Sequence, residues 1–428
     1  MPSKRPLIFL SALLVVISGF LTAAAPAFAA SKERVLYSLC PESGCIDGDF
    51  AIGGVIFDSA GNLYGTAYGG GAHDAGTVYE LSPGTNGKWT QKLLHTFNNT
   101  DGSGPEYSMI FDPAGNLYGT TFFGGPASGG VVFQLKRGAN GWTEQVLHSF
   151  ADGSEGFYPV GVLTIDAAGN LYGTTNAGGS FSGAVYQLSR SVDGSWNVKV
   201  LHSFTGGGDG ANPGGGVIFD AAGNLYGTTY QGGGSACGGK GCGIVFELSP
   251  AGNGHWKEKV LHRFNGVNGA NPDAGLIFDG AGNLYGTTYY GGKAACNPPS
   301  GCGTVFELSP GTGGHWTEKV LRSFHANPKG PTAALVFDRS GNLYGTTSTG
   351  ASTGCSGAGC GKVFKLTPAG NGNWTYSTLH IFLQNGKDGN TPCAGMVLDS
   401  AGNLYGTTYQ GGSGIWNVGC GAVFEITP

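Results

Sequence analysis

The chain has 428 residues, of which 83 are Gly and 20 are Pro, while 40% are hydrophobic and only 11% are charged. The Gly has no three-residue period, which excludes a collagen-like fibre, and the apolar content is too high for a disordered chain. The formal net charge of −5 comes without any run of Lys or Arg, so nothing indicates nucleic-acid binding. This composition favours an all-β protein with many short strands and Gly-rich turns.

The first segment of the chain is typical of a secretory signal peptide. Lys4 and Arg5 precede an apolar run over residues 7–23, and Ala27 and Ala29 follow at the spacing of a cleavage site. We expect cleavage to leave residues 30–428 as one domain that is secreted, periplasmic or on the cell surface. An uncleaved anchor is the less favoured alternative, because the run is shorter than the roughly 20 residues of a membrane span.

Ten cysteines fit an exported protein, because oxidising compartments preserve disulfides. Four short loop disulfides are predicted from local spacing: Cys40 with Cys45, Cys237 with Cys242, Cys296 with Cys302, and Cys355 with Cys360. The remaining Cys393 and Cys420 predict one longer bridge. Zinc is the alternative for paired cysteines, but no stretch has the two short Cys/His pairs of a zinc motif. We therefore expect no metal and no cofactor.

A phrase close to G-N-L-Y-G-T occurs seven times, at intervals of 54 to 61 residues. Its Asn is at Asn62, Asn116, Asn170, Asn224, Asn283, Asn342 and Asn403. Nearly fixed periods of this length indicate a repeat architecture, so the fold is interpreted from the repeating unit first. The whole mature chain is therefore one array, with no second domain and no linker.

Each repeat reads as four short strands without a helix. In the unit over residues 215–264 the segments are G-G-V-I-F-D, N-L-Y-G-T-T-Y, G-I-V-F-E-L-S-P and W-K-E-K-V-L-H-R-F. Asp220 can accept backbone hydrogen bonds and Gly223 can take a positive φ, so the phrase itself predicts a strand, a turn and a strand.

Seven such units predict a seven-bladed β-propeller with four antiparallel strands per blade. A β-solenoid would repeat at shorter intervals. The last unit lacks its fourth strand, whereas Val35–Ser38 near the N-terminus matches the missing V-L-H-S. We expect a 1+3 closure, in which the N-terminal strand completes the seventh blade beside Ala422–Ile426 and leaves no open edge there.

The motifs D-x-x-G-N-L-Y-G-T, G-x-V-F-E-L-S-P and W-x-x-x-V-L-H-S-F resemble those of the GloVer (Gloeo/Verruco) tandem-repeat family of bacterial proteins. The resemblance covers nearly all of the mature chain. It implies an exported, surface or extracellular protein, and it brings no activity and no catalytic residues.

Residues that recur in every unit are expected to be structural, because a ring usually has one catalytic locus. The repeated Asp is predicted to cap its turn at Asp58, Asp112, Asp166, Asp220, Asp279, Asp338 and Asp399. Calcium is less favoured there, since one Asp and one Asn per turn do not supply its ligands. The repeated histidines and tryptophans are likewise predicted to be structural: His95, His148, His202, His262 and His380, and Trp89, Trp142, Trp196, Trp256, Trp316 and Trp374.

A single G-x-S-x-G string at residues 350–354 lies in a Gly/Ser loop that leads to Cys355. A nucleophile elbow needs a strand before the Ser and a helix after it, so we interpret the string as a chance match. No catalytic residue is predicted.

Residues that vary between units are the candidates for ligand binding. They are the loop residues Asp101, Asp152, Asp209, Asn271 and Asp388, the second-strand aromatics Tyr68, Phe123, Tyr230, Tyr290 and Tyr409, and Trp416. Polar acceptors beside aromatic faces suit a glycan or a protein partner. The alternative is that these residues fill turns and cover the edge of the core.

Two functions from different classes follow. The first is a monomeric binding or interaction scaffold for an extracellular glycan or protein. The second is an extracellular carbohydrate hydrolase or lyase at the channel mouth, which needs a close pair of unrepeated carboxylates among Asp101, Glu106, Asp152 and Glu155. A surface scaffold without any small ligand is the third reading.

Overall fold

The computed structural model describes residues 31–151, 153–179, 182–293, 302–325, 330–350, 354–355, 357–414 and 419–428. The predicted signal peptide, Asp152, Cys296, residues 351–353 of the G-x-S-x-G string and Trp416 lie outside the described residues. Residues Ser31–Pro428 form one compact unit. In the described part of the chain, no helix has the length and apolar character needed to cross a membrane.

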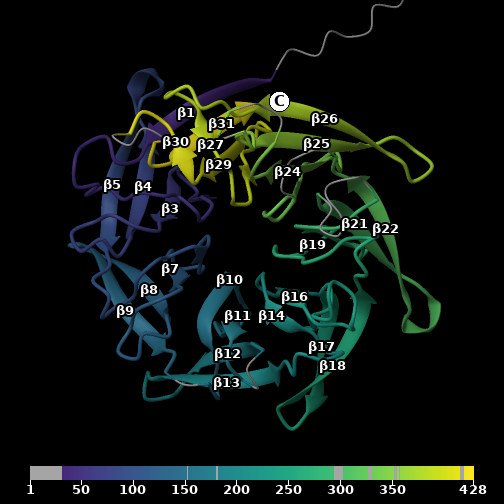
Figure 1. Cartoon of the computed structure of the whole chain (residues 1–428). Coiled ribbons are helices and arrows are strands. Elements are labelled where there is room, and N and C mark those ends of the chain that lie inside the picture. The colour runs from purple at the N-terminus through teal and green to yellow at the C-terminus, as the bar shows by residue number, and fades with distance from the viewer. Residues whose placement is uncertain are drawn as a thin grey trace, which may run out of the picture. The chain divides into compact units, whose positions relative to one another are not determined.

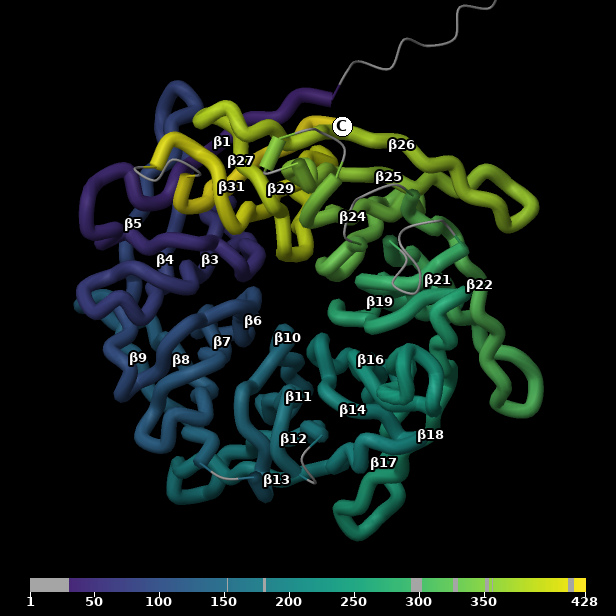
Figure 2. The backbone as a smooth tube through the Cα atoms, in the orientation of Figure 1, coloured from purple at the N-terminus to yellow at the C-terminus, as the bar shows by residue number. Residues whose placement is uncertain are grey.

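Seven antiparallel sheets form a ring in this unit, and each sheet corresponds to one repeat (Figure 1). This is the predicted seven-bladed β-propeller. Within a blade, the first strand lies nearest the centre of the ring and the fourth lies at its outer edge (Figure 2).

The first strands are β2 Ile56–Phe57, β6 Ile110–Phe111, β10 Phe157–Ile165, β15 Ile218–Phe219, β19 Ile277–Phe278, β23 Val336–Phe337 and β28 Val397–Leu398. The second strands are β3 Leu63–Ala67, β7 Leu117–Thr121, β11 Leu171–Ala177, β16 Leu225–Gln231, β20 Leu284–Thr288, β24 Leu343–Thr347 and β29 Leu404–Thr408. The third strands are β4 Thr77–Pro83, β8 Val131–Gly138, β12 Ala184–Arg190, β17 Ile244–Gly252, β21 Thr304–Pro310, β25 Lys362–Pro368 and β31 Ala422–Thr427. The fourth strands are β5 Trp89–Thr96, β9 Gly141–Ser149, β13 Trp196–Ser203, β18 His255–Arg263, β22 Trp316–Ser323, β26 Trp374–Ile381 and β1 Lys32–Ser38.

Smaller elements complete the blades. In the fourth blade, β14 Ala211–Pro213 also pairs with β16, so this sheet has five strands instead of the predicted four. A separate two-stranded sheet joins β27 Gly389–Asn390 to β30 Gln410–Gly411. Short 3-10 turns stand between third and fourth strands at η1 Thr85–Gly87 and η2 Thr312–Gly314.

The two ends of the described unit meet in one blade, as predicted. Strand β1 pairs antiparallel with β31, with Val35 opposite Phe424 and Ser38 opposite Ala422. Figure 1 shows this purple strand beside the yellow C-terminal strands. Because β1 supplies the fourth strand of a blade whose other three strands come from the C-terminal end, the 1+3 closure is confirmed.

The repeated Asp forms the hydrogen bonds that its motif predicts. In the unit of the fourth blade, Asp220 Oδ1 accepts the backbone N–H groups of Ala222 at 2.9 Å and Asn224 at 2.8 Å. Its Oδ2 accepts the Asn224 side-chain amide at 2.8 Å and the Tyr226 hydroxyl at 3.0 Å. Gly223 closes the turn with a φ of +84°. Partial burial opposes the effect, but these donors hold the pKa of Asp220 below its usual value.

The Gly inside L-Y-G-T has a packing role. Gly227 of β16 stands opposite Phe246 of β17, and a Cβ at this position would lie 2.6 Å from Phe246 Cζ. The ring of Phe246 therefore lies over the glycine and reaches the neighbouring blade, where it meets Phe204 edge to face at 5.2 Å. Such buried clusters between adjacent blades make up most of the core.

Three of the predicted loop disulfides are formed: Cys40–Cys45, Cys237–Cys242 and Cys355–Cys360. Cys302 is also disulfide-bonded, and its predicted partner lies outside the described residues. The predicted bridge between Cys393 and Cys420 does not form.

The repeat alignment explains why that bridge is absent. Cys420 precedes the Gly before a third strand, as Cys242 and Cys360 do, and it is buried with Cys40 and Cys45 with the three sulfur atoms within 4.8 Å of one another. Cys393 belongs to the innermost segment of its blade instead. Its thiol donates to the Thr391 carbonyl at 3.3 Å.

Candidate functional site

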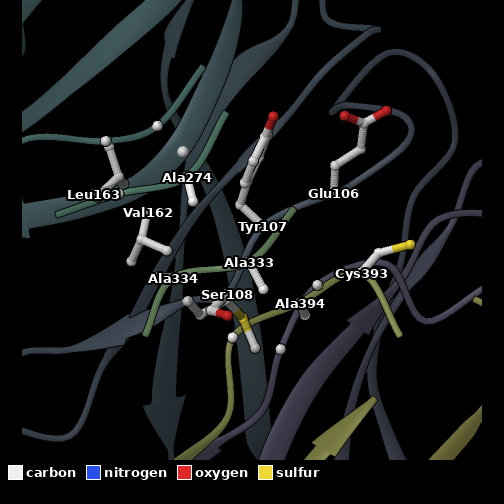
Figure 3. A pocket seen from close by; sticks show the side chains of 18 of the residues that line it. Glu106, Tyr107, Ser108, Val162, Leu163, Ala274, Ala333, Ala334, Cys393 and Ala394 are labelled. Carbon is white, nitrogen blue, oxygen red and sulfur yellow. The ribbon is translucent and has the colours of Figure 1, made fainter. Parts of the chain in front are cut away.

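The innermost segments of all seven blades line one cavity of about 590 Å³ (Figure 3). The lining segments are residues 52–56, 106–110, 161–164, 214–218, 273–276, 332–334 and 393–397. Gly and Ala make up 12 of the 31 lining residues, and backbones of different blades approach closely here. A Cβ at Gly216, for example, would lie 2.0 Å from the Val162 carbonyl oxygen.

One position of the repeat contributes a different residue from every blade. It lies six residues before the repeated Asp and holds Ile52, Glu106, Val160, Gly214, Asp273, Thr332 and Cys393, which we call the mouth residues. All of them except Val160 line the cavity. The positions on either side of it are nearly uniform among the blades. The chemical differences between blades inside the cavity therefore come mainly from this position.

The next position is small in six blades and aromatic in one. Tyr107 stands where the other blades have Gly53, Gly161, Gly215, Ala274, Ala333 and Ala394. Figure 3 shows the Tyr107 and Glu106 side chains pointing to the same side of the segment that carries both. Burial, Glu106 and Asp273 raise the pKa of Tyr107 well above its usual value, against a hydrogen bond with the Gly161 backbone. The phenol is therefore neutral and lies within the electrostatic reach of both carboxyl groups.

Glu106 and Asp273 are the only charged residues among the described residues that line the cavity, and no Lys, Arg or His accompanies them. Burial raises the pKa of Glu106 to about 7. The Asp273 side chain is exposed to the cavity, yet protein surrounds it. That enclosure and the charge of Glu106 raise the pKa of Asp273 to about 7. The two groups come from the second and fifth blades, and only the closed ring brings their charges together.

Tyrosines at or just after the ends of four second strands lie within electrostatic range of mouth residues. Burial and then the charge of Glu106 raise the pKa of Tyr68, and burial and Asp273 raise that of Tyr230 to about 12. Burial, then the neighbouring Tyr290 and Tyr230, and then Asp273 and Cys393 raise the pKa of Tyr289. Burial and then Cys393 raise the pKa of Tyr409. The mouth therefore combines carboxyl groups with an aromatic rim.

The backbone of the rim is held in a strained conformation. The residue two positions before the mouth residue has a positive φ in six blades, including Phe50 at +55°, Tyr158 at +61° and Thr391 at +58°. Such a φ is unfavourable for aromatic and β-branched residues and persists only where surrounding contacts fix it. The N–H of each of these residues donates to a loop carbonyl of the preceding blade, as from Tyr158 to Gly129 at 2.8 Å.

Most of the polar residues predicted for ligand binding have local partners. Asp101 accepts the Asn98 N–H at 2.9 Å and lies 3.2 Å from His95. Asp209 accepts the backbone N–H and the hydroxyl of Thr205, and Asp388 accepts the Leu383 N–H and lies 3.1 Å from His380. The Asn271 side chain donates to the Tyr230 carbonyl at 2.8 Å. Their role as ligand contacts stays a prediction, and the site described here does not depend on it.

Three of the repeated histidines, His148, His262 and His380, have hydrogen-bond partners in their own loops. His148 Nε2 lies 2.9 Å from Glu155, and His262 Nε2 lies 2.9 Å from the Asn268 side chain. Glu155 is therefore engaged with a structural His. Among the described carboxylates suggested for catalysis, Glu106 is the one that lines the cavity.

The predicted aromatic residues divide into two groups. Tyr68, Tyr230 and Tyr409 lie within electrostatic range of mouth residues, whereas Tyr290 packs against Tyr289 with ring centroids 4.4 Å apart. Phe123, which is 40% exposed, packs edge to face with Phe122. Phe122 in turn stacks on Tyr158 with centroids 4.8 Å apart.

Sequence reasoning missed Asp273 and Tyr107 and assigned Cys393 to a bridge. Aligning the seven repeats on their Asp would have shown one column with Glu106, Asp273 and Cys393, and a neighbouring column with one Tyr among small residues. What the alignment alone does not contain is that this column faces the axis of the ring.

The Gloeobacter/Verrucomicrobia repeat profile matches residues 28–239 and 295–428, which is most of the sequence. The chain belongs to the Gloeobacter/Verrucomicrobia repeat family. No curated protein matches this family member. Among solved structures it is similar to a luciferin-regenerating enzyme, with 14% identity, a TM-score of 0.45 and alignment over 75% of this chain and 90% of that one. It is also similar to a putative oxidoreductase (glucose dehydrogenase) of Thermus thermophilus, with 17% identity, a TM-score of 0.43 and coverage of 74% and 95%.

Proposed function

We propose that this protein is an exported binding module that holds a glycan at the mouth of its central cavity. The observation that carries the proposal is the single variable column of the repeat, which places Glu106 and Asp273 in a cavity whose other lining residues are mostly small and apolar. Ligand sites are typically concave and apolar, with a few convergent polar groups.

The rim supplies the second component of glycan recognition. Tyr68, Tyr230 and Tyr409 bring aromatic groups within electrostatic range of the mouth residues Glu106, Asp273 and Cys393. The two carboxylates can accept hydrogen bonds from hydroxyl groups. Flat aromatic faces pack against the apolar faces of sugar rings, and carboxylates fix the orientation of the hydroxyls. The strained rim backbone and its bonds between blades keep these groups in place before the ligand arrives, which lowers the entropic cost of binding.

Export is supported by the predicted leader and by the disulfides, which persist in oxidising compartments. The expected site of action is therefore outside the cytoplasm, where glycans of envelopes and matrices are abundant.

A glycan array tests the proposal, followed by titration of each bound glycan against Glu106→Gln, Tyr230→Ala and the control Tyr376→Ala. Tyr376 is an aromatic residue on the outer strand β26, away from the cavity lining. We expect the first two variants to weaken binding at least ten-fold and Tyr376→Ala to bind as the wild type does. An array without bound glycans, or a protein partner captured at the same surface, would contradict the proposal.

A second candidate, a glycan hydrolase or lyase, is favoured by one observation. Glu106 and Asp273 line the same cavity. Burial raises the pKa of Glu106 to about 7, and burial together with the charge of Glu106 raises that of Asp273 to about 7, the range that suits general acid–base catalysis at neutral pH. Release of new reducing ends from glycans, abolished in both Glu106→Gln and Asp273→Asn, would establish it. Glycan binding without product formation would contradict catalysis and support the binding function only.

A further inference from the structure

The charge of the cavity indicates which glycans the mouth would accept. Its described lining contains two carboxyl groups and no basic side chain. A neutral sugar needs donors as well as acceptors from its site, because hydroxyls both donate and accept hydrogen bonds. An ammonium group only donates, and it is best held by carboxylates and aromatic faces together.

We propose, building on the proposed function, that the mouth binds a glycan with free amino groups and holds one ammonium between Glu106 and Asp273. The two carboxyl groups come from different blades and line the same cavity. The charge of Glu106 contributes to the raised pKa of Asp273, and Tyr68, Tyr230 and Tyr289 lie within electrostatic range of one or the other carboxyl group. The neutral Tyr107 phenol lies within electrostatic range of both carboxyl groups and adds no charge that would compete with the ligand.

Binding of a cation would be coupled to protons. The pKa values of Glu106 and Asp273 lie near 7 in the empty cavity, so the pair carries less than its full charge at neutral pH. An ammonium ion stabilises the ionised forms, and its binding releases protons to the buffer. Affinity should therefore fall as the pH falls below 7, where protons compete with the ligand for the carboxylates.

Cys393 provides a reporter that needs no ligand. Cys393 is one of the mouth residues and is partly exposed. Burial, together with the nearby charge of Asp273, raises the pKa of its thiol to about 12. Methanethiosulfonates react with the thiolate, which attacks the sulfenyl sulfur and expels methanesulfinate to form a mixed disulfide. The modification rate of Cys393 is measured with a cationic trimethylammonioethyl reagent and with an anionic sulfonatoethyl reagent. Each rate is divided by the rate at which the same reagent reacts with free 2-mercaptoethanol. The ratio of the two normalised rates then compares a cation with an anion at the site.

At pH 8 we expect the normalised rate ratio to favour the cationic reagent by at least about ten-fold, since two negative charges attract one reagent and repel the other. In the double variant Glu106→Gln, Asp273→Asn, and in the wild type at pH 5.5, the ratio should approach one. Asp193→Asn removes one charge from an exposed turn and should leave the ratio unchanged. Cys393→Ser gives the background from the buried Cys420.

Calorimetry with fully deacetylated and fully N-acetylated β-1,4-linked glucosamine hexamers completes the test. The deacetylated hexamer should bind at least ten-fold more tightly at pH 7.5 and lose this advantage in the double variant. A rate ratio near one, or equal affinity for the two hexamers, overturns this inference and leaves the glycan proposal standing. A cation preference at Cys393 with no glycan bound on the array or in calorimetry supports the ammonium site and overturns the proposed function.

Discussion

Each of the seven repeated aspartates caps the turn of one hairpin. Because the same hydrogen bonds are needed in every blade, the G-N-L-Y-G-T motif is nearly the same in all seven repeats. Each accepts two backbone N–H groups, an Asn amide and a Tyr hydroxyl within its own turn, as at Asp58 and Asp399. One acceptor therefore links the turn backbone to the tyrosine of the second strand, which packs between blades. The residue serves structure at every position, and nothing in the described turns requires calcium.

Replacing Asp220 by Ala is expected to lower the free energy of unfolding by about 2 kcal/mol, because four donors lose their acceptor. The control is Ala221→Ser in the same turn, at an exposed position where changes stay within about 0.5 kcal/mol. Urea denaturation measures both. Equal stabilities of the two variants would show that the cap is unimportant.

The half-buried His262 of β18 predicts a pH dependence of stability. Burial lowers the pKa of His262 to about 4, so it stays neutral in the folded state while the unfolded chain takes up a proton below about 6.5. The unfolded state then binds more protons, and stability falls as the pH drops from 6.5 towards 4, by about 1.4 kcal/mol per unit from this group.

His262→Gln removes that titration. Urea denaturation at pH 7 and at pH 5 should show a larger loss of stability in the wild type than in this variant, because the other ionisable groups contribute equally to both. Parallel losses in the two proteins would mean that His262 titrates normally.

At the scale of elements, the loop disulfides stabilise loops between strands that bury few hydrophobic side chains. Cys237–Cys242 and Cys355–Cys360 each close a loop with a sequence separation of five residues between a second and a third strand. The second cysteine of each pair directly precedes the Gly that comes just before the third strand. Each disulfide therefore restrains the loop beside the rim on which the candidate site depends.

The variant Cys355→Ser, Cys360→Ser should lose about 2 kcal/mol, as expected from the loop entropy of so short a crosslink. Differential scanning calorimetry of the variant and of the wild type, both without reductant, measures the loss. Since the loop is local, the unfolding transition should remain single. An unchanged midpoint would assign the disulfide no role in stability.

At the scale of the whole molecule, closure of the ring depends on β1. This strand pairs with β31 along its length and buries Leu36, and Leu39 directly after it is fully buried. Without β1 the ring would lack its final strand, and β31 would present an open edge. The core cluster between the seventh and first blades would also open to solvent.

Deleting residues 31–38 is expected to abolish the single cooperative transition and to produce oligomers through the exposed β31 edge. Size-exclusion chromatography and thermal denaturation, with the chain of residues 31–428 as control, provide the measurement. A monomeric deletion variant that melts at the control temperature would show that the closure adds nothing to stability.

The sequence by itself determined the blade count, the four strands of most blades and the 1+3 closure, because these features depend on short local sequence motifs. A turn needs Asp and Gly within a few residues, and a strand needs an alternating or apolar run. The extra strand β14 and the small sheet of β27 and β30 were missed, since their segments of two or three residues carry no such pattern.

Only the tertiary structure decided where the candidate site lies. Glu106 and Asp273 belong to different repeats, and Cys393 was read as a partner for Cys420 because sequence distance gave no other choice. Closing the ring turns one repeat position towards the axis and brings six unlike residues to one cavity, so their proximity is a property of the assembled blades. The loop acids looked equally available in the sequence, but the folded loops use them as acceptors for neighbouring backbone and histidine groups.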